Sequence, residues 1–366
     1  MAYTTIDDPS AYFHIQLWTG NGSSQTITND ANAGDFSPDW VWIKNRSSSG
    51  GAGPQIIWNT TRTKDREFHL NTTEAEHTTT NGITAFNANG FDLGNGGTVN
   101  ENTSSFVSWQ WKANGNSRTS YSASGNQLAG DFQANTTAGF SIITYTGNAT
   151  NGATVQHGLG ATPEMVWLKD RDNTGDAGGT NWIAAYTIQD GSNDRLYVNG
   201  NNAKYDLSGT ETRVEFDSSN ITLGTWNNIN ASGPHVGFCF RSIQGYSKFG
   251  KFTGNGNVDG PFIYTGFKPA WLMIKSHIGT DNWIIYDSKR NGSNGQGSDA
   301  GNARLYANTT AAEDLTADQI SLYSNGFAPT SDYSSINYNN GNYIYYAFAE
   351  EPLVANVGES IPATAR

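Results

Sequence analysis

The chain has 366 residues, which is more than one ordinary domain needs and enough for two to four domains that each bury a core. Only 15% of the residues are charged while 12% are aromatic and 42 are glycine, a composition that favours strands and turns over long amphipathic helices. The formal net charge of −12, without a cluster of lysine and arginine, excludes nucleic acid as an expected partner.

The first ten residues contain neither a basic segment nor an apolar segment of the kind found in secretory signal peptides. No stretch of the chain approaches the length of apolar sequence that spans a membrane. We therefore expect synthesis in the cytoplasm without secretion or membrane insertion.

The first predicted strand runs from Phe13 to Thr19 and ends in a Gly20-Asn21 turn. The next begins after Pro38 and continues to Lys44 with apolar residues on both faces, which indicates a central strand buried on both sides. The later elements are a Trp-bearing strand, a short strand ending in Asn, a turn-and-strand unit and an alternating closing strand, at Trp58, Leu70-Asn71, Asn89-Gly90-Phe91 and Val107-Trp109-Trp111. The period of two in the closing strand predicts that it is half-buried.

Residues 114–138 come next, and they are polar with little apolar periodicity. This composition predicts a flexible linker. We expect the first domain to move relative to the rest of the chain.

The same order of elements then occurs twice more. In the second copy the anchors are Phe140-Asn148, Pro163-Lys169, Trp182, Val198-Asn199, Asn220-Ile221 and Val236-Phe238-Phe240. After a short junction at residues 241–246, the third copy has Lys251-Asn255, Pro269-Lys275, Trp283, Ala307-Asn308, Asn325-Gly326-Phe327 and Ile344-Tyr346-Phe348. The short junction predicts that copies two and three pack as a fixed pair.

The spacing of the anchors supports a true internal repeat. From the Pro to the closing strand the copies span 69, 73 and 75 residues. We therefore divide the chain into repeat 1 at 1–113, a linker at 114–138, repeat 2 at 139–243, repeat 3 at 244–352 and a C-terminal tail at 353–366.

Each repeat offers six to eight short strands, regular turn signals and no crossover helix. This pattern predicts an all-β protein made of three tandem antiparallel β-sandwiches of the jelly-roll or concanavalin type. A three-bladed propeller is the alternative, although linkers of unequal length argue against a closed ring. Trp40, Trp167 and Trp271 are expected to pack in the cores rather than to form ligand platforms.

The usual motifs of catalysis are missing. No Gly-x-Ser-x-Gly elbow or phosphate-binding loop occurs, and the six histidines lack the His-x-His and His-Glu-x-x-His spacings of zinc sites. His157 is expected in a turn, and Cys239 as a small buried side chain. We therefore assign no catalytic, cofactor-binding or metal-binding residue and expect no enzymatic activity.

Acidic residues leave two alternatives open. Paired carboxylates of a glycosidase can come from distant strands, and Asp170, Asp172, Asp176, Glu313 and Asp314 are the candidates. The loop from Asp170 to Asp176 also faintly resembles a calcium loop, but it lacks the terminal Glu, which favours a plain turn.

A second echo joins the segment from Trp58 to Arg62 with the segment from Tyr286 to Arg290. Repeat 2 lacks the Arg, so a side-chain cap on a turn is favoured over a repeated catalytic set.

Three motifs carry a resemblance to known proteins. They are Asp-Trp-Val-Trp-Ile-Lys-Asn-Arg at 39–46, Gly-Phe-Ser-Ile-Ile-Thr-Tyr-Thr-Gly at 139–147 and Gly-Tyr-Ser-Lys-Phe-Gly-Lys-Phe-Thr-Gly-Asn-Gly at 245–256. Through them the chain resembles, over residues 3 to 353, a family of tail-fibre-like or structural virion proteins of marine bacteriophages. The resemblance implies a virion component with lectin-like sandwich domains and assigns no functional residues.

The leading hypothesis is a tail-associated adhesin that binds a host-surface glycan or receptor without catalysis. Long loops rich in Asn, Gly, Ser and aromatic residues suit recognition, and Trp226, Tyr333 and Tyr338 lie in such loops. The expected partners are other virion proteins, a host glycan or receptor, and further copies of the chain in a homo-oligomer. A capsid decoration or tail knob is the first alternative, because the chain lacks the long shaft of a fibre, and a host-polysaccharide depolymerase is the second.

Overall fold

The structure is a computed structural model, and it describes residues 4–30, 36–47, 53–173, 179–207, 209–291, 303–315 and 319–352. The predicted C-terminal tail at 353–366 lies outside the described residues. The described chain consists of antiparallel sheets with only short helices, which confirms the all-β prediction. Among these residues no helix combines the length and the apolar character needed to cross a bilayer.

Repeat 1 contributes one six-stranded and one three-stranded sheet, with strand orders β1-β9-β3-β4-β5-β6 and β2-β8-β7. A 3-10 turn η1 (Pro9–Ala11) precedes the first strand. The elements are β1 (Phe13–Thr19), β2 (Gln25–Thr28), β3 (Trp40–Asn45), β4 (Gln55–Asn59), β5 (Arg66–His69), β6 (His77–Thr78), β7 (Ile83–Asn87), β8 (Gly90–Leu93), α1 (Gly97–Asn100) and β9 (Ser105–Trp111).

Repeat 2 has the same plan with an eight-stranded sheet, β10-β11-β12-β20-β14-β15-β16-β17, and the three-stranded sheet β13-β19-β18. The elements are β10 (Thr119–Tyr121), β11 (Gly130–Asn135), β12 (Phe140–Gly147), β13 (Ala153–Gln156), β14 (Met165–Asp170), β15 (Ile183–Tyr186), β16 (Asp194–Tyr197), β17 (Tyr205–Asp206), β18 (Val214–Phe216), β19 (Asn220–Leu223), α2 (Asn227–Asn230) and β20 (Gly233–Phe240).

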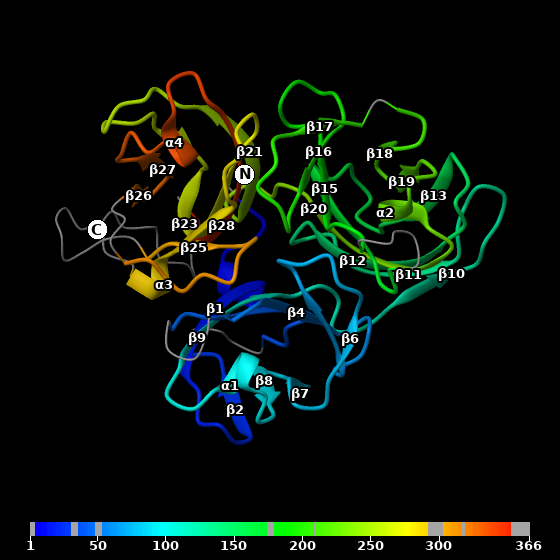
Figure 1. The fold of residues 1–366 in the computed structure, drawn as a ribbon, viewed down its shortest axis with the longest axis horizontal. Helices are drawn as coiled ribbons and strands as arrows, with labels where there is room; N and C mark the ends of the chain where they lie inside the picture. The colour runs from blue at the N-terminus through cyan, green and yellow to red at the C-terminus, as the bar shows by residue number, and fades with distance from the viewer. Residues whose placement is uncertain are drawn as a thin grey trace.

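Repeat 3 pairs a five-stranded sheet, β21-β28-β23-β24-β25, with the three-stranded sheet β22-β27-β26. The elements are β21 (Ser247–Thr253), β22 (Ile263–Tyr264), β23 (Phe267–Ser276), β24 (Ile284–Asp287), α3 (Ser288–Asn291), β25 (Leu305–Tyr306), β26 (Ile320–Tyr323), β27 (Gly326–Pro329), α4 (Ser334–Asn337) and β28 (Asn342–Pro352). The three sheet pairs lie around a common centre (Figure 1).

Each sheet pair encloses its own hydrophobic cluster. In repeat 1 the alternate residues Val41 and Ile43 of β3 pack with Phe91 and Leu93 of the small sheet. The equivalent clusters of repeats 2 and 3 likewise join residues of the large and the small sheet. Short strands with apolar residues at every second position suffice for this arrangement.

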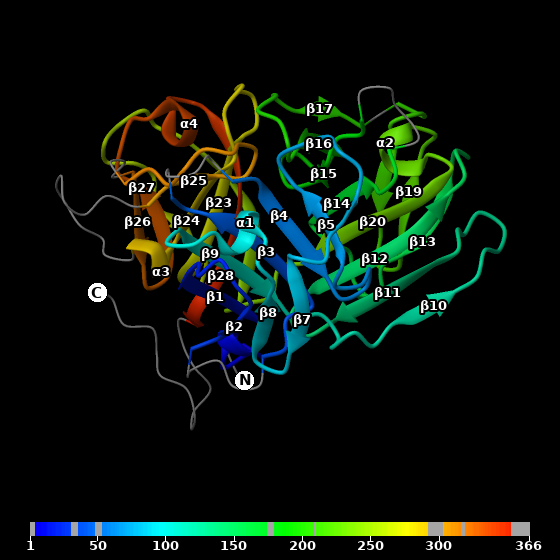
Figure 2. The same ribbon diagram turned by 60° about the horizontal axis from the view of Figure 1, so that its bottom comes forward.

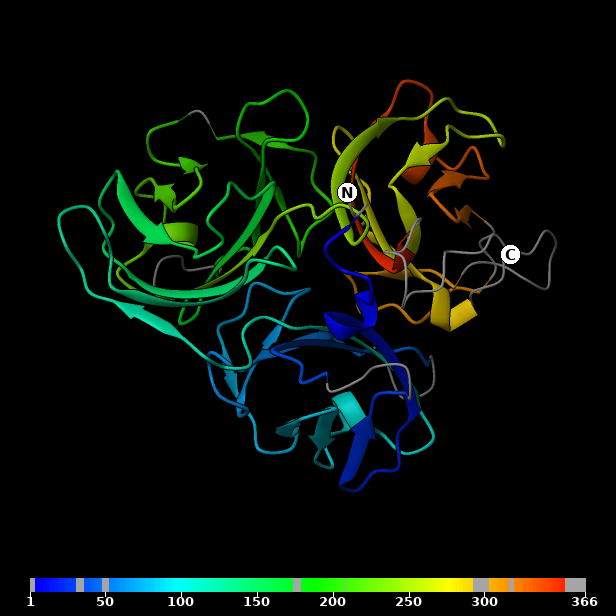
Figure 3. The ribbon, with the colours of Figure 1, turned by 180° about the vertical axis from the view of Figure 1, so that it is seen from behind.

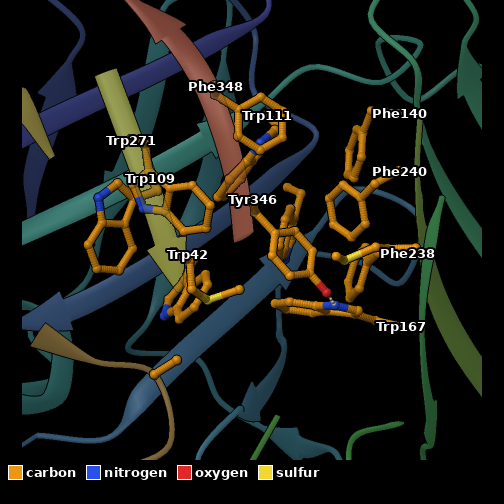
Figure 4. Packing of buried hydrophobic residues seen from close by; sticks show 14 of the residues in the cluster. Trp42, Trp109, Trp111, Phe140, Trp167, Phe238, Phe240, Trp271, Tyr346 and Phe348 are labelled. Atoms are coloured by element: carbon orange, nitrogen blue, oxygen red, sulfur yellow. Dashed lines mark hydrogen bonds between the residues drawn. The ribbon is translucent and has the colours of Figure 1, made fainter. Parts of the chain in front are cut away.

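A fourth and larger cluster lies where the three large sheets meet. The other face of β3 places Trp40 and Trp42 there, together with aromatic residues of repeats 2 and 3. Trp40 stacks on Phe238 with a centroid distance of 4.5 Å, and Phe13 stacks on Phe348 at 5.1 Å. Figure 4 shows this central core, including the hydrogen bond from Trp167 Nε1 to the Tyr346 hydroxyl.

The central core corrects the expectation of three separate cores. The closing strands β9, β20 and β28 were predicted to be half-buried, but both faces of each are buried because one faces its own sheet pair and the other faces the centre. Trp40, Trp167 and Trp271 are at most 2% exposed, so their predicted core role is confirmed.

Three equivalent backbone hydrogen bonds close the repeats into a ring. The amide of Glu76 donates to the carbonyl of Arg171, that of Lys204 to His277, and that of Glu313 to Arg46. Thus repeat 1 contacts repeat 2, repeat 2 contacts repeat 3, and repeat 3 contacts repeat 1 in the same way. Such head-to-tail contacts form a closed ring because the rotation between units returns to its start.

A buried lysine at the end of each Pro-led strand reinforces the same three interfaces. Lys44 Nζ donates to the carbonyl of Thr310 at 2.9 Å, Lys169 Nζ to Thr73 at 3.2 Å, and Lys275 Nζ to Asn201 at 3.4 Å. All three side chains are buried, and burial lowers the pKa of Lys169 to about 7. Each ammonium thus provides donors for backbone carbonyls of the neighbouring repeat.

Residues 114–138 are not a flexible linker. They contain β10 and β11, which pair along the outer edge of the repeat-2 sheet (Figure 2). The segment begins with backbone amides of Gly115 and Asn116 held by the Asp39 carboxylate. An exposed edge strand needs no apolar alternation, which is why the sequence resembled a linker.

The predicted Trp-bearing strand is correct only in part. Register places Asn59, Tyr186 and Asp287 at equivalent positions, opposite Trp40, Met165 and Trp271 respectively. Trp58 is therefore equivalent to Tyr286 and packs inside the repeat-1 sheet pair, whereas Trp182 and Trp283 lie in the central core.

One buried asparagine ends the helix of each repeat, at Asn100, Asn230 and Asn337. In repeat 2 the Asn230 amide donates to the carbonyls of Gly224 and Thr150, and its Oδ1 accepts from the Asn148 amide. Asn100 and Asn337 make the equivalent bonds in their own repeats. The predicted Gly-Asn turns after the opening strands are held by this network.

We expect an excised repeat 1, residues 1–113, not to form a stable monomer. Excision exposes Trp40, Trp42, Trp109 and Trp111, each of which buries about 150–250 Å². The intact chain is expected to unfold in a single transition that circular dichroism and tryptophan fluorescence report together. A cooperative unfolding transition of the excised repeat would contradict the shared core.

We expect Asn230→Ala to lower the free energy of unfolding by about 1–2 kcal/mol, because the buried carbonyl of Gly224 loses its partner, as do the Thr150 carbonyl and the Asn148 amide. Urea unfolding measures this loss. The control is Asn126→Ala, since Asn126 is exposed and bonds through its backbone. A loss below about 0.5 kcal/mol for Asn230→Ala would show that the network is not stabilising.

We expect the free energy of unfolding to depend on pH through His235. Burial lowers the pKa of His235 to about 4, and its ring stacks on Tyr145 at 4.9 Å. The unfolded chain takes up this proton near pH 6.5, so stability is full above that pH and falls by up to about 3 kcal/mol as the pH drops to 4. We expect His235→Phe to show a smaller loss over this range in urea titrations, and equal pH dependence of both proteins would refute the assignment.

Candidate functional site

Two of the carboxylates considered for catalysis, Glu313 and Asp314, form ion pairs with arginines. Glu313 lies 2.7 Å from Arg46 and 2.9 Å from Arg290, and Asp314 pairs with Arg304. Because Arg46 belongs to repeat 1 and Arg290 to repeat 3, Glu313 bridges an interface of the ring. An equivalent set, Arg62, Glu76 and Arg171, bridges repeats 1 and 2.

The Asp-rich loop forms a turn where it is described. Asp170 is buried, and its Oδ1 accepts from the amides of Asp172 and Asn173. Burial raises the pKa of Asp170 to about 6. Asp176 lies outside the described residues.

The second sequence echo also forms a turn. The amide of Arg62 donates to Asn59 Oδ1 and that of Arg290 to Asp287 Oδ1, as expected for a side-chain cap. His157 likewise accepts from the Leu159 amide in the turn before β14, and burial lowers its pKa. The predicted structural roles of these residues are confirmed.

Two of the loop aromatics pack against arginines. The guanidinium of Arg195 lies 4.1 Å from the ring of Trp226, and that of Arg304 lies 5.1 Å from the ring of Tyr333. Both rings precede the short helix of their repeat, so each arginine clamps the helix to the large sheet by a cation–π contact. Tyr338, in contrast, is 62% exposed.

Among the residues that the structure describes, the most exposed cluster of aromatic side chains lies on the small sheet of repeat 3. Phe262, Tyr264 and Tyr323, which we call the aromatic patch, are 51%, 48% and 42% exposed. The rings of Phe262 and Tyr323 are 5.8 Å apart, and Tyr264 and Tyr323 flank Gly326 on either side. Adjacent aromatic rings facing solvent mark an interaction surface more often than isolated ones.

Gly326 shapes the patch. A Cβ on this residue would approach Phe262 Cζ to 2.9 Å and the Ile263 carbonyl oxygen to 2.1 Å. The absence of a side chain therefore lets the Phe262 ring lie over the sheet. Lys248 borders the patch, with its Nζ 5.5 Å from the Tyr264 ring centre.

Repeats 1 and 2 lack the patch. The pairing of Ile27, Val155 and Ile263 with the central strand of each small sheet aligns the three repeats. At the positions of Phe262, Tyr264 and Tyr323, repeat 1 has Thr26, Thr28 and Asn87, and repeat 2 has Thr154, Gln156 and Asp217. Polar residues are thus compatible with the fold here, so core packing does not require the aromatic side chains.

The structure brings two of the dispersed histidines together. His69 Nδ1 lies 3.1 Å from Glu74 Oε2, and His77 Nε2 lies 3.4 Å from the same oxygen. Of the described residues, these three form the group whose side chains could hold a metal ion. This group has no His-x-His motif in the sequence, because its two histidines are eight residues apart on neighbouring strands.

Two open hollows of about 370 and 400 Å³ lie beside the interface of repeats 1 and 2. Both are bordered by Arg171 and Pro234. Since Arg171 is already paired with Glu76, the hollows offer less unsatisfied binding chemistry than the aromatic patch.

A family model described as a domain of unknown function, DUF7483, matches residues 8–352. No curated protein matches the chain. Because the match includes all three repeats and both junctions, the chain belongs to the DUF7483 family.

Proposed function

We propose that the chain is a structural protein of a bacteriophage virion that binds a host-surface glycan or receptor and has no catalytic activity. The observation that carries the binding role is the aromatic patch, three exposed rings at positions where the other two repeats have polar residues. The resemblance of the repeat motifs to virion proteins of marine bacteriophages supports the virion assignment and a tail-associated location. In this proposal the three sheet pairs are lectin-like sandwiches of the jelly-roll or concanavalin type.

The geometry of the patch suits a sugar or an apolar peptide segment. Phe262 and Tyr323 present ring faces and edges on which the apolar face of a pyranose can lie, while the Tyr264 and Tyr323 hydroxyls and Lys248 supply hydrogen bonds at the margin. The floor of the patch is a paired sheet rather than a loop, so little ordering accompanies binding.

Of the three repeats, only repeat 3 has the aromatic patch, so avidity cannot come from the repeats of a single chain. Three weak sites within one chain are not available, because repeats 1 and 2 have polar residues there. Avidity must then come from several copies of the chain on one virion, consistent with the expected homo-oligomer and with partners among other virion proteins.

Two alternatives remain as outcomes of the test. In a capsid decoration or tail knob, the same patch contacts another virion protein and leaves host adsorption untouched. In a depolymerase, carboxylates would cleave the polysaccharide, but Glu313 and Asp314 are held in ion pairs with arginines, which favours a structural role for them.

We expect the triple variant Phe262→Thr, Tyr264→Thr, Tyr323→Asn, which copies repeat 1, to bind host cells and host polysaccharide at least about tenfold more weakly than the natural chain. Repeat 1 tolerates these residues, so folding should be kept, and circular dichroism checks it. The matched control is Tyr338→Ser, which removes an exposed ring outside the patch and should leave binding unchanged.

Equal binding by the triple variant and the natural chain would overturn the role of the patch. If the natural chain binds no host component yet occurs in purified virions, the accessory role is correct. Release of reducing ends from host polysaccharide would establish the depolymerase instead.

A further inference from the structure

The group of His69, Glu74 and His77 is built by a hairpin of repeat 1. Strands β5 and β6 pair with Glu67 opposite His77, so the side chains of Glu67, His69 and His77 share one face of the hairpin. Glu74 lies in the connecting loop. Thr72 Oγ1 donates to Glu74 Oε2 at 3.0 Å and orients this carboxylate toward the histidines.

The distances suit a small tetrahedral cation. Ligand atoms around Zn²⁺ at bond lengths of about 2.0–2.1 Å are separated by about 3.3 Å. The separations of Glu74 Oε2 from His69 Nδ1 and from His77 Nε2 are 3.1 and 3.4 Å, and the three ligand atoms all lie within 4.8 Å of one another. Only the two histidine nitrogens must approach each other for the ion to be held.

The surroundings resemble the outer shell of a metal site. His69 Nε2 faces Glu67 Oε1 at 3.6 Å, while the opposite ring nitrogen, Nδ1, points to Glu74. A carboxylate on the far nitrogen fixes the tautomer that leaves the near nitrogen free to coordinate. His77 Nε2 is buried as an atom although the side chain is 40% exposed, and it faces Glu74 Oε2 at 3.4 Å.

In repeats 2 and 3, a contact between an arginine and aromatic rings occupies the place of this group. At the positions of Glu67 and His69, repeat 2 has Arg195 and Tyr197, and repeat 3 has Arg304 and Tyr306, each pair joined by a cation–π contact. The aromatic residue at the helix start, Trp226 or Tyr333, is Gly96 in repeat 1. Repeat 1 therefore lacks the clamp that the other two repeats use at this place.

We propose that His69, Glu74 and His77 bind one divalent transition-metal ion, Zn²⁺ by the chemistry of the ligands, with the fourth position open to solvent. The ion would fasten the loop between β5 and β6. That loop carries Thr73, whose carbonyl accepts from Lys169, and Glu76, which pairs with Arg171, so the ion would secure the interface of repeats 1 and 2. Imidazole and carboxylate ligands select Zn²⁺ over Mg²⁺, which prefers oxygen ligands.

Zn²⁺ binding to the untagged full chain tests the proposal, measured by competition with a chromophoric chelator. We expect one Zn²⁺ per chain and the absorption of tetrahedral Co²⁺ when Co²⁺ is used instead. His77→Ala and Glu74→Gln should each weaken Zn²⁺ binding at least tenfold. Both side chains are partly exposed, so these variants should fold.

A control separates this site from general surface binding. Glu215→Gln removes a carboxylate of similar exposure that pairs with Arg213, and it should bind Zn²⁺ like the natural chain. Zn²⁺, but not Mg²⁺, should raise the melting temperature of the natural chain and of Glu215→Gln and leave that of His77→Ala unchanged. Equal Zn²⁺ affinity of the natural chain, His77→Ala and Glu74→Gln would overturn the proposal.

Discussion

Burial of aromatic side chains on both faces of three closing strands is the constraint on which the rest of the fold depends. One face of β9, β20 and β28 completes its own sheet pair, and the other contributes Trp109, Phe238 and Tyr346 to the common centre. Separating any one of the three large sheets from the other two would expose large aromatic rings to water. In the ring of three repeats (Figure 3), each repeat buries the otherwise exposed apolar face of the large sheets of the other two.

The interfaces share a backbone frame but differ in charge. Two are bridged by a glutamate between arginines, with Glu76 and Glu313 in the centre. At the third interface, between repeats 2 and 3, Lys204 occupies the position of the glutamate and pairs with Asp194 and Asp206. The residue whose carbonyl accepts from the Lys204 amide is His277 instead of an arginine. Backbone hydrogen bonds thus fix the common geometry while side chains make each interface distinct, so that a repeat fits best against its own neighbour.

Sequence patterns predicted elements better than their assembly. The Pro-led strands ending in Lys44, Lys169 and Lys275 were recognised as buried on both faces, because their apolar residues are continuous. The alternation of Val107, Trp109 and Trp111 predicts a half-buried closing strand β9, yet Gln110 between them is also buried, and its amide donates to Asn29 Oδ1. A polar residue with a buried partner cannot be told from an exposed one without the fold.

The candidate sites depend on register for the same reason. His69 and His77 meet only because a two-residue strand folds back on β5, and the aromatic patch stands out only when the small sheets are aligned by their pairing. A repeat search could have found the buried asparagines, since Asn100, Asn230 and Asn337 precede the closing strands at similar distances. It could not have shown that the repeats form a ring, because the pattern of a single repeat does not indicate which surface of another repeat it contacts.

A ribosome must deliver almost the whole chain before the central core can be completed. Strand β28 lies between β21 and β23, and Phe348 on it stacks against Phe13 from the opposite end of the sequence. Contacts of such long range make folding slow and leave early aromatic surface exposed to other nascent chains. Synthesis of this protein therefore places a demand on chaperones that three independently folding domains would not.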